Sequence, residues 1–360
     1  MPCPVRTSPP APRLSRRGLL RSAAAGALAL VTLAGCGPVA LGGPQEHTPP
    51  PPGIDDLYRA DLLAVIERAI AGTEHLVEQA GGIAAGSPAL SAALDVLASA
   101  LPVQRTALLT GAQAEREREA RQDPRGQSAP PPPADAPTDT AGLVAALVEL
   151  RDLAVAASRQ VSGSLARPTA GIAAHSAWIA LRLRSAAGTG EVTPSPTAEQ
   201  IVPGREVPAT DPPSVGAQAD FHTLLEQAQQ EEWYAGYLHE VLAARTEGEA
   251  RERHLGRSAL HRARGQALGL IAEEEGAPVV PRQALYPIPG GTLDPERAGQ
   301  LPTLLAQGLL VDHVSLVGAA PFAHRPLSIA AALAEAELLA PLVDRMEPLP
   351  SLEAEDPADG

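Results

Sequence analysis

The sequence predicts an all-α protein built from two four-helix bundles that are joined by a proline-rich linker. Apolar residues recur at helical spacing, and no stretch shows the sustained alternation of β-branched residues expected of a strand. Proline-rich breaks, such as the four prolines at 49–52 and at 130–133, separate these periodic segments. The connections between the expected helices also follow the same order of lengths in both halves of the chain.

In the first half, the apolar periodicity predicts helices over 55–80, 87–121, 138–161 and 168–184. Ser87 and Thr138 are expected N-caps, because a side-chain oxygen at this position accepts from the first free N–H groups. Pro88 and Pro168 fall where the first turn of a helix tolerates proline. These helices form the predicted first bundle, residues 54–185.

In the second half, helices are predicted over 216–246, 249–275, 294–320 and 326–346. Asp294 is the expected N-cap of the third, and Pro326 is placed in the first turn of the fourth. These helices form the predicted second bundle, residues 216–347. The proline-rich linker then covers 186–215, and an acidic tail covers 348–360.

The connections indicate the topology of each bundle. In each half a short link joins the first two helices, a long one joins the second and third, and a short one joins the last two. One long crossover in a four-helix bundle is the ferritin-like arrangement. Matching fragments about 157 residues apart suggest an internal duplication, for example Ile172-Ala173-Ala174 and Ile329-Ala330-Ala331.

The second half also resembles a family of actinobacterial ferritin-like domains of unknown function. The resemblance covers about 220–347 and rests on three motifs: Glu231-Glu232-Trp233-Tyr234-Ala235-Gly236-Tyr237, His261-Arg262-Ala263-Arg264 and Tyr286-Pro287-Ile288-Pro289. It implies a fold and no particular activity. Trp233, Tyr234 and Tyr237 are expected to contact the core and the crossover, and Trp178 of the first bundle is expected in its core.

The N-terminal sequence is typical of an export signal followed by a lipid attachment site. Residues 1–35 resemble a bacterial twin-arginine lipoprotein signal peptide, with the pair Arg16 and Arg17 followed by an apolar run and then Leu33-Ala34-Gly35-Cys36. The run of about 15 residues is shorter than the ~20 that span a bilayer. An ordinary cleaved signal with a chance cysteine, or a weak transmembrane anchor, is the alternative to the lipoprotein interpretation, and general secretion is the alternative to the twin-arginine route. We expect Cys36 to carry fatty acyl groups such as palmitate, and residues 36–53 to tether the protein to the extracytoplasmic face of the cell membrane.

Composition limits the function classes. The chain has 28 basic and 42 acidic residues, and five of its arginines precede Cys36, so the mature part carries 23 against 42, or −19. Such a charge argues against nucleic acid and anionic lipid surfaces as partners. Cys3 and Cys36 are the only cysteines, so the mature fold has no disulfide or thiolate site.

The second bundle contains four candidate metal ligands: Glu232, His261, Asp312 and Glu335. A ferritin-like di-iron site uses a Glu-x-x-His motif on each of two helices, and the chain has no such motif in a core-facing place. No metal or other cofactor is therefore expected, and the four residues are interpreted as a buried hydrogen-bonded set that fixes helix register, or as parts of solvated faces. The arginines of 257–264 are interpreted as a solvated face.

These observations favour a non-enzymatic, lipid-anchored cell-envelope protein that binds an unidentified protein or small molecule. No catalytic motif, such as a Gly-x-Ser-x-Gly elbow or a phosphate-binding loop, is present. The alternative is a metal-dependent oxidase or a metal-storage protein with an atypical carboxylate and histidine site. Export of folded proteins by the twin-arginine route keeps this alternative open.

Overall fold

The computed structural model describes residues 52–82, 87–122, 133–206, 218–288 and 291–352, and these form one compact unit. Within these ranges the structure contains helices and no strands, which confirms the predicted all-α class. The export signal with Arg16 and Arg17, the lipid attachment site Cys36 and most of the tether lie outside the described residues.

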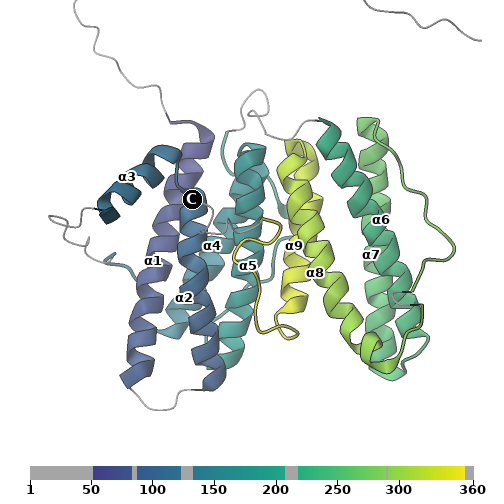
Figure 1. Ribbon diagram of the computed structural model, residues 1–360, viewed down its shortest axis with the longest axis horizontal. Coiled ribbons are helices and arrows are strands. Elements are labelled where there is room, and N and C mark those ends of the chain that lie inside the picture. Colours follow the sequence, from purple (N-terminus) through teal and green to yellow (C-terminus); the bar gives the residue numbers. More distant parts are fainter. Residues whose placement is uncertain (1–51, 83–86, 123–132, 207–217, 289–290, 353–360) are drawn as a thin grey trace, which may run out of the picture. The chain divides into compact units, whose positions relative to one another are not determined.

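Four helices of the first half pack around a common core (Figure 1). They are α1 (Ile54–Gly82), α2 (Pro88–Leu108), α4 (Thr140–Gln160) and α5 (Gly163–Ala187). Helix α1 packs against α2 and α4, and α5 packs against the same two helices, so the contacts close a ring. Their inward faces are rich in leucine and alanine, as the helical spacing predicts.

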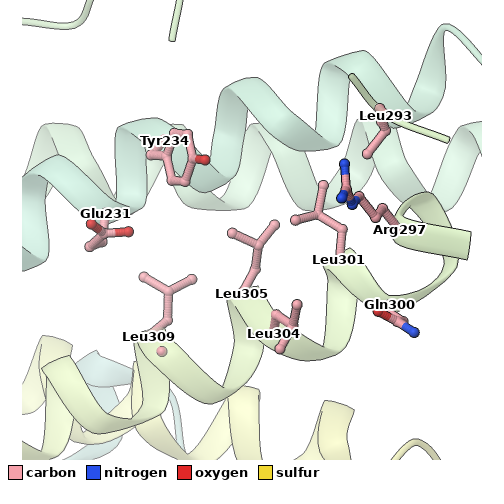
Figure 2. Close-up of a pocket in the computed structure, with 10 residues that line it drawn as sticks. Glu231, Tyr234, Leu293, Arg297, Gln300, Leu301, Leu304, Leu305 and Leu309 are labelled. Atoms are coloured by element: carbon pink, nitrogen blue, oxygen red, sulfur yellow. The ribbon is translucent and has the colours of Figure 1, made fainter. Parts of the chain in front are cut away.

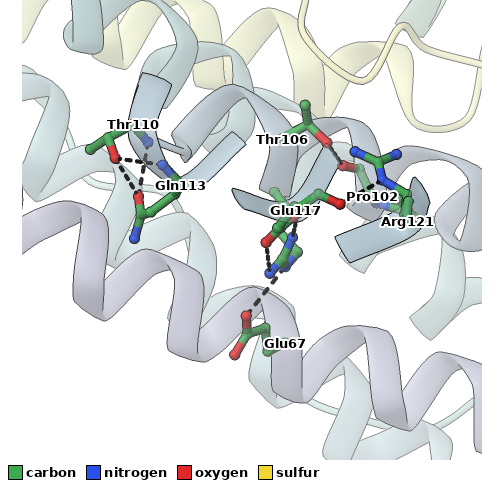
Figure 3. A network of polar contacts seen from close by, with 8 residues as sticks. Glu67, Pro102, Thr106, Thr110, Gln113, Glu117 and Arg121 are labelled. Atoms are coloured by element: carbon green, nitrogen blue, oxygen red, sulfur yellow. Dashed lines mark hydrogen bonds and ion pairs between the residues drawn. The ribbon is translucent and has the colours of Figure 1, made fainter. Parts of the chain in front are cut away.

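The helix predicted over 87–121 is instead two helices, α2 and α3 (Gly111–Gln122). Thr110 begins the second one: its N–H donates to Gln113 Oε1 at 2.9 Å, and the Gln113 N–H donates to Thr110 Oγ1 at 3.3 Å. This reciprocal pairing is a capping box, and Figure 3 shows it. The prediction of one continuous helix was wrong, because apolar periodicity alone does not reveal a cap inside the segment.

Helix α3 is held against the rest of the molecule by charge, since none of its side chains is buried. The guanidinium of Arg105 on α2 bonds Glu117 on α3 at 2.7 Å and Glu67 on α1 at 3.2 Å. These carboxylates appear in Figure 3. The arrangement explains how a polar helix that buries no apolar face is positioned.

Two helices begin at residues other than those predicted. Asp139, and not Thr138, caps α4, with its carboxylate accepting from the Gly142 N–H at 2.7 Å. Helix α5 begins five residues before the predicted Pro168, because Asp55 accepts both the N–H (2.9 Å) and the hydroxyl (2.5 Å) of Ser162 at its start. A contact from α1 thus sets the beginning of α5, which local periodicity cannot reveal.

The second half contributes α6 (Gln218–Ala243), α7 (Gly248–Glu275), α8 (Pro295–Ala319) and α9 (Arg325–Leu339). Helix α6 packs mainly on α7 and also on α8, and α8 packs on α9. Asp294 caps α8 as predicted, accepting from the Arg297 N–H at 2.9 Å. Helix α9 ends seven residues earlier than predicted. By length and apolarity α8 would suit a membrane span, but most of its apolar window is buried inside the protein.

Helices α8 and α9 also pack against α5, so one apolar core runs through both halves. Trp178 on α5 is fully buried in this core, as predicted, together with Val314 of α8 and Leu333 of α9. The part of the predicted linker that the structure describes is hydrogen-bonded to the first half, for example from Arg151 to the Thr193 carbonyl at 2.7 Å. The domain boundary at 186–215 stays a prediction.

Four arginines join the two halves, and we call them the arginine clasp: Arg159, Arg167, Arg182 and Arg325. Each donates from one half to a backbone carbonyl of the other. Arg182 on α5, for instance, bonds the carbonyls of Ala340 (3.0 Å) and Val343 (2.7 Å). The clasp extends into the predicted tail, where Arg167 holds Ser351.

Candidate functional site

The centre of the second half is a buried carboxylate, Glu232 on α6, with no solvent exposure. His261 on α7 donates to its Oε2 at 2.8 Å, and His313 on α8 donates to its Oε1 at 2.7 Å. Burial alone would raise the pKa of Glu232, but these two hydrogen bonds and the charges of His313 and Arg264 outweigh it and lower the pKa to about 2. Glu232 is therefore ionised at neutral pH.

A guanidinium lies between this carboxylate and a second one. Arg264 on α7 places Nη1 at 2.5 Å from Glu335 of α9 and at 3.5 Å from Glu232. Glu335 is fully buried, and only 7% of Arg264 is exposed. Four helices thus meet in one network, the buried charge core: Glu232, His261, Arg264, His313 and Glu335.

The interpretation of Arg264 as a solvated residue was wrong. It follows His261 by three residues and precedes Leu268 by four, so all three lie on the buried stripe of α7. That spacing was readable from the sequence, but the surrounding arginines and glutamates suggested a charged surface. His313 was also missed, because its neighbour Asp312 was taken as the inward residue.

The four candidate ligands are only partly brought together. Glu232 and His261 are in contact, as proposed, whereas Glu335 reaches them through Arg264. Asp312 turns instead toward Gln227, whose amide donates to it at 2.7 Å. Among the described residues no three His, Cys, Asp or Glu side chains are placed to hold a metal ion. The Arg264 guanidinium also supplies a fixed positive charge where a cation would sit.

Histidines extend the charge core toward the surface. The His239 ring stacks on His261 with centroids 5.3 Å apart, and its Nδ1 lies 3.1 Å from Nδ1 of the partly exposed His254. Burial, with the nearby charges of His261, His254 and Arg257, lowers the pKa of His239 to about 3. Neutral His239 therefore separates the ionised core from solvent at physiological pH.

A pocket of about 440 Å³ lies between α6 and α8, beside the charge core, and we call it the α6/α8 pocket (Figure 2). Its walls are mostly leucine: Leu293, Leu301, Leu304, Leu305 and Leu309. Polar groups enter from Glu231, Tyr234, Arg297 and Gln300. Its volume and its few polar groups fall within the range of small-molecule sites, ~300–1,000 Å³.

Glycine creates part of this space. Gly308 lies in the middle of α8 and lines the pocket, and outside the backbone of its own helix no described atom would lie within 4 Å of a Cβ added to it. Glycine inside a helix costs roughly 0.5–1 kcal/mol relative to alanine. At this position the missing side chain leaves the pocket open next to Leu304, which is 59% exposed.

The aromatic cluster of α6 supports the opposite wall. Tyr234 and Tyr237 contact Tyr286 of the α7–α8 crossover, with ring centroids 5.9 and 5.5 Å apart. Trp233 donates from Nε1 to the Val280 carbonyl at 3.1 Å. The expectation that these residues contact the core and the crossover is confirmed. The crossover thereby fixes the helix that carries Glu231 and Tyr234.

A different buried histidine in the first half predicts an acid-sensitive stability. Within the described residues, neither ring nitrogen of His175 has a hydrogen-bond partner, and burial lowers its pKa to about 4. The unfolded chain binds this proton below about pH 6.5, so stability is lost as the pH falls from 6.5 toward 4, by about 3 kcal/mol in total. We expect His175→Leu to reduce the difference in unfolding free energy between pH 7 and pH 4.5, measured by urea unfolding. A smaller difference remains, because His239 also has a lowered pKa.

The matched control is His75→Leu on α1, where the ring is exposed. It should leave the difference between the two pH values unchanged. An equal pH dependence of stability in His175→Leu and in the unmodified protein would show that His175 does not contribute to the loss.

Comparison with known families, with curated proteins and with solved structures finds no match to this chain. The site is therefore interpreted from its own geometry.

Proposed function

We propose that this protein is a lipid-anchored cell-envelope protein that binds a small molecule with a large apolar part and has no catalytic role. The α6/α8 pocket is the observation that carries the proposal. It combines apolar walls with a few polar groups, which is the usual composition of a ligand site. The anchor proposed at Cys36 would hold this pocket near the outer surface of the cell membrane.

The proposal includes two ferritin-like bundles. Support comes from the lengths of the connections: α6–α7 and α8–α9 are close in sequence, whereas 19 residues separate Glu275 at the end of α7 from Pro295 at the start of α8. The first half repeats this order around its α3-containing crossover. In ferritin-like metal proteins the bundle core carries the metal ligands. Here an arginine occupies that place, which favours binding over redox chemistry.

Binding is tested with an uncharged fluorescent dye, N-phenyl-1-naphthylamine, and the variant Gly308→Leu. We expect the dye to bind the unmodified protein, and Gly308→Leu to weaken binding at least about tenfold because the leucine fills the pocket. Its stability should not fall, since leucine is a better helix former than glycine. Gly299→Leu is the control, because Gly299 lies on α8 outside the pocket and its Cβ would also meet open space. Equal binding by both variants would refute the pocket as the site.

Anchoring is tested with Cys36→Ser. Without the thiol no thioether to a diacylglyceryl group can form, so we expect the protein in the soluble or culture fraction, or as an uncleaved precursor. Fractionation and lipid labelling measure this. A cleaved, lipid-labelled variant that stays with membranes would contradict the assignment. Arg16→Lys with Arg17→Lys should block export if the twin-arginine route is used.

A further inference from the structure

The α6/α8 pocket has a charged side chain at each end. Glu231 on α6 lies near Leu309, and Arg297 lies at the opposite end near Leu293, with leucines between them (Figure 2). A ligand that fills the pocket therefore meets a carboxyl group at one end and a guanidinium at the other. The two ends differ in whether the charged side chain already has a partner within the protein.

Arg297 already has partners of its own. Its guanidinium lies 3.7 Å from the Asp294 carboxylate and donates to the Thr292 carbonyl at 3.4 Å. Both side chains of the ion pair are about half exposed, so water screens whatever charge is left. An anionic ligand would have to compete with Asp294 and with solvent.

At the other end of the pocket, the carboxyl group of Glu231 has no described partner that neutralises its charge. It is half-buried, and within the described residues it has no hydrogen bond and no ion pair. A second carboxylate, Asp312 on α8, is close enough that its charge, after burial itself, raises the pKa of Glu231. Asp312 is itself buried, and its carboxylate accepts a hydrogen bond from the neutral Gln227 amide. Burial raises the pKa of Asp312, although the charge of the neighbouring His313 opposes this. Two carboxyl groups therefore lie near each other at this end of the pocket, and no described cation pairs with Glu231.

We propose that the α6/α8 pocket selects amphiphilic cations, with an ammonium group paired to Glu231 and an aliphatic chain lying along the leucines of α8. This inference rests on the ligand-binding function proposed above and adds the chemical class of the ligand. The strongly acidic mature chain, at −19, draws cations toward the protein and opposes anions. A cationic lipid and a soluble hydrophobic amine share this chemistry.

The test compares three molecules with the same chain and different heads: decylamine, decanol and decanoate. Each displaces N-phenyl-1-naphthylamine from the full-length chain carrying Cys36→Ser, so that no covalently attached lipid competes. The measurements are made at low ionic strength and below micelle formation. We expect decylamine to bind at least about tenfold more tightly than decanoate.

The variant Glu231→Gln should remove this preference, weakening decylamine about tenfold while leaving decanol unchanged. Glu226→Gln, an exposed position on the same helix outside the pocket, should leave all three affinities as they are. Retention of the preference in Glu231→Gln, or decanoate binding as tightly as decylamine, would overturn the inference. Displacement by all three molecules without a charge preference would overturn it and leave the proposed function standing. Absence of dye binding to the unmodified protein would overturn both.

Discussion

Glu232→Gln is expected to destabilise the protein by about 3–5 kcal/mol, the typical loss when one partner of a buried charge network is removed. The glutamine keeps the size of the side chain but loses the negative charge that His261, His313 and Arg264 share. Arg264 would then have one buried carboxylate, Glu335, in place of two. Urea unfolding at pH 7, followed by circular dichroism, measures the change.

Glu240→Gln is the matched control on the same helix. Glu240 pairs with Arg262 where both side chains are partly exposed, and such pairs contribute only about 0–1 kcal/mol. Equal effects of the two substitutions would mean that the charge core does not stabilise the fold.

The same Glu232 variant also tests the metal alternative. We expect protein purified without chelator to contain well under one iron, manganese or zinc per chain. We also expect the difference in melting temperature between added metal and chelator to be zero, with or without the substitution. A stoichiometric metal that disappears in Glu232→Gln would favour the oxidase or storage function over ligand binding.

Arg325→Met is expected to destabilise the protein by more than about 3 kcal/mol. Arg325 is 2% exposed, and it donates to the carbonyls of Ala320 (2.8 Å), Ser158 (3.2 Å) and Val161 (2.6 Å). Methionine fills a similar volume without donors, so several buried carbonyls lose a partner, and each such loss costs about 1–3 kcal/mol. Two of them, those of Ser158 and of the C-cap residue Val161, lie at the C-terminal end of α4, whose amides should exchange hydrogen faster.

Arg325→Lys distinguishes the effect of the positive charge on stability from the effect of hydrogen-bond geometry, because lysine keeps the charge but presents it from a single nitrogen. It should recover only part of the stability. Arg297→Met, an exposed arginine of α8, should change stability by less than about 0.5 kcal/mol. Hydrogen exchange in α4 that is unaltered in Arg325→Met would contradict the role assigned to the clasp.

The helices were predictable because their signals are local. Apolar spacing located α1, α4, α6 and α7 to within a few residues, and the Asp294 cap was read directly from the sequence. The starts of α3 and α5 could not be predicted from local signals. The first depends on the side-chain pair of Thr110 and Gln113, and the second depends on Asp55 from another helix.

The site was predictable only in part. Contact between Glu232 and His261 followed from their central positions on neighbouring helices, and the structure confirms it. The inward direction of Arg264 and His313 depends on the rotation of α7 and α8 about their axes, which adjacent polar residues leave ambiguous. The α6/α8 pocket depends on the open space between two helices beside Gly308, and no local pattern encodes that space.

The arginine clasp has a consequence for how this protein tolerates sequence change. Every member of the clasp donates to main-chain oxygen across the junction, at positions such as Phe322, Ala340 and Val161. Every amino acid supplies that oxygen, so substitutions at the accepting positions preserve the acceptor as long as the backbone keeps its path. The polar part of the junction is therefore specified by the four donating arginines and not by the side chains at the accepting positions, whereas the apolar core shared by α5, α8 and α9 still depends on side-chain identity.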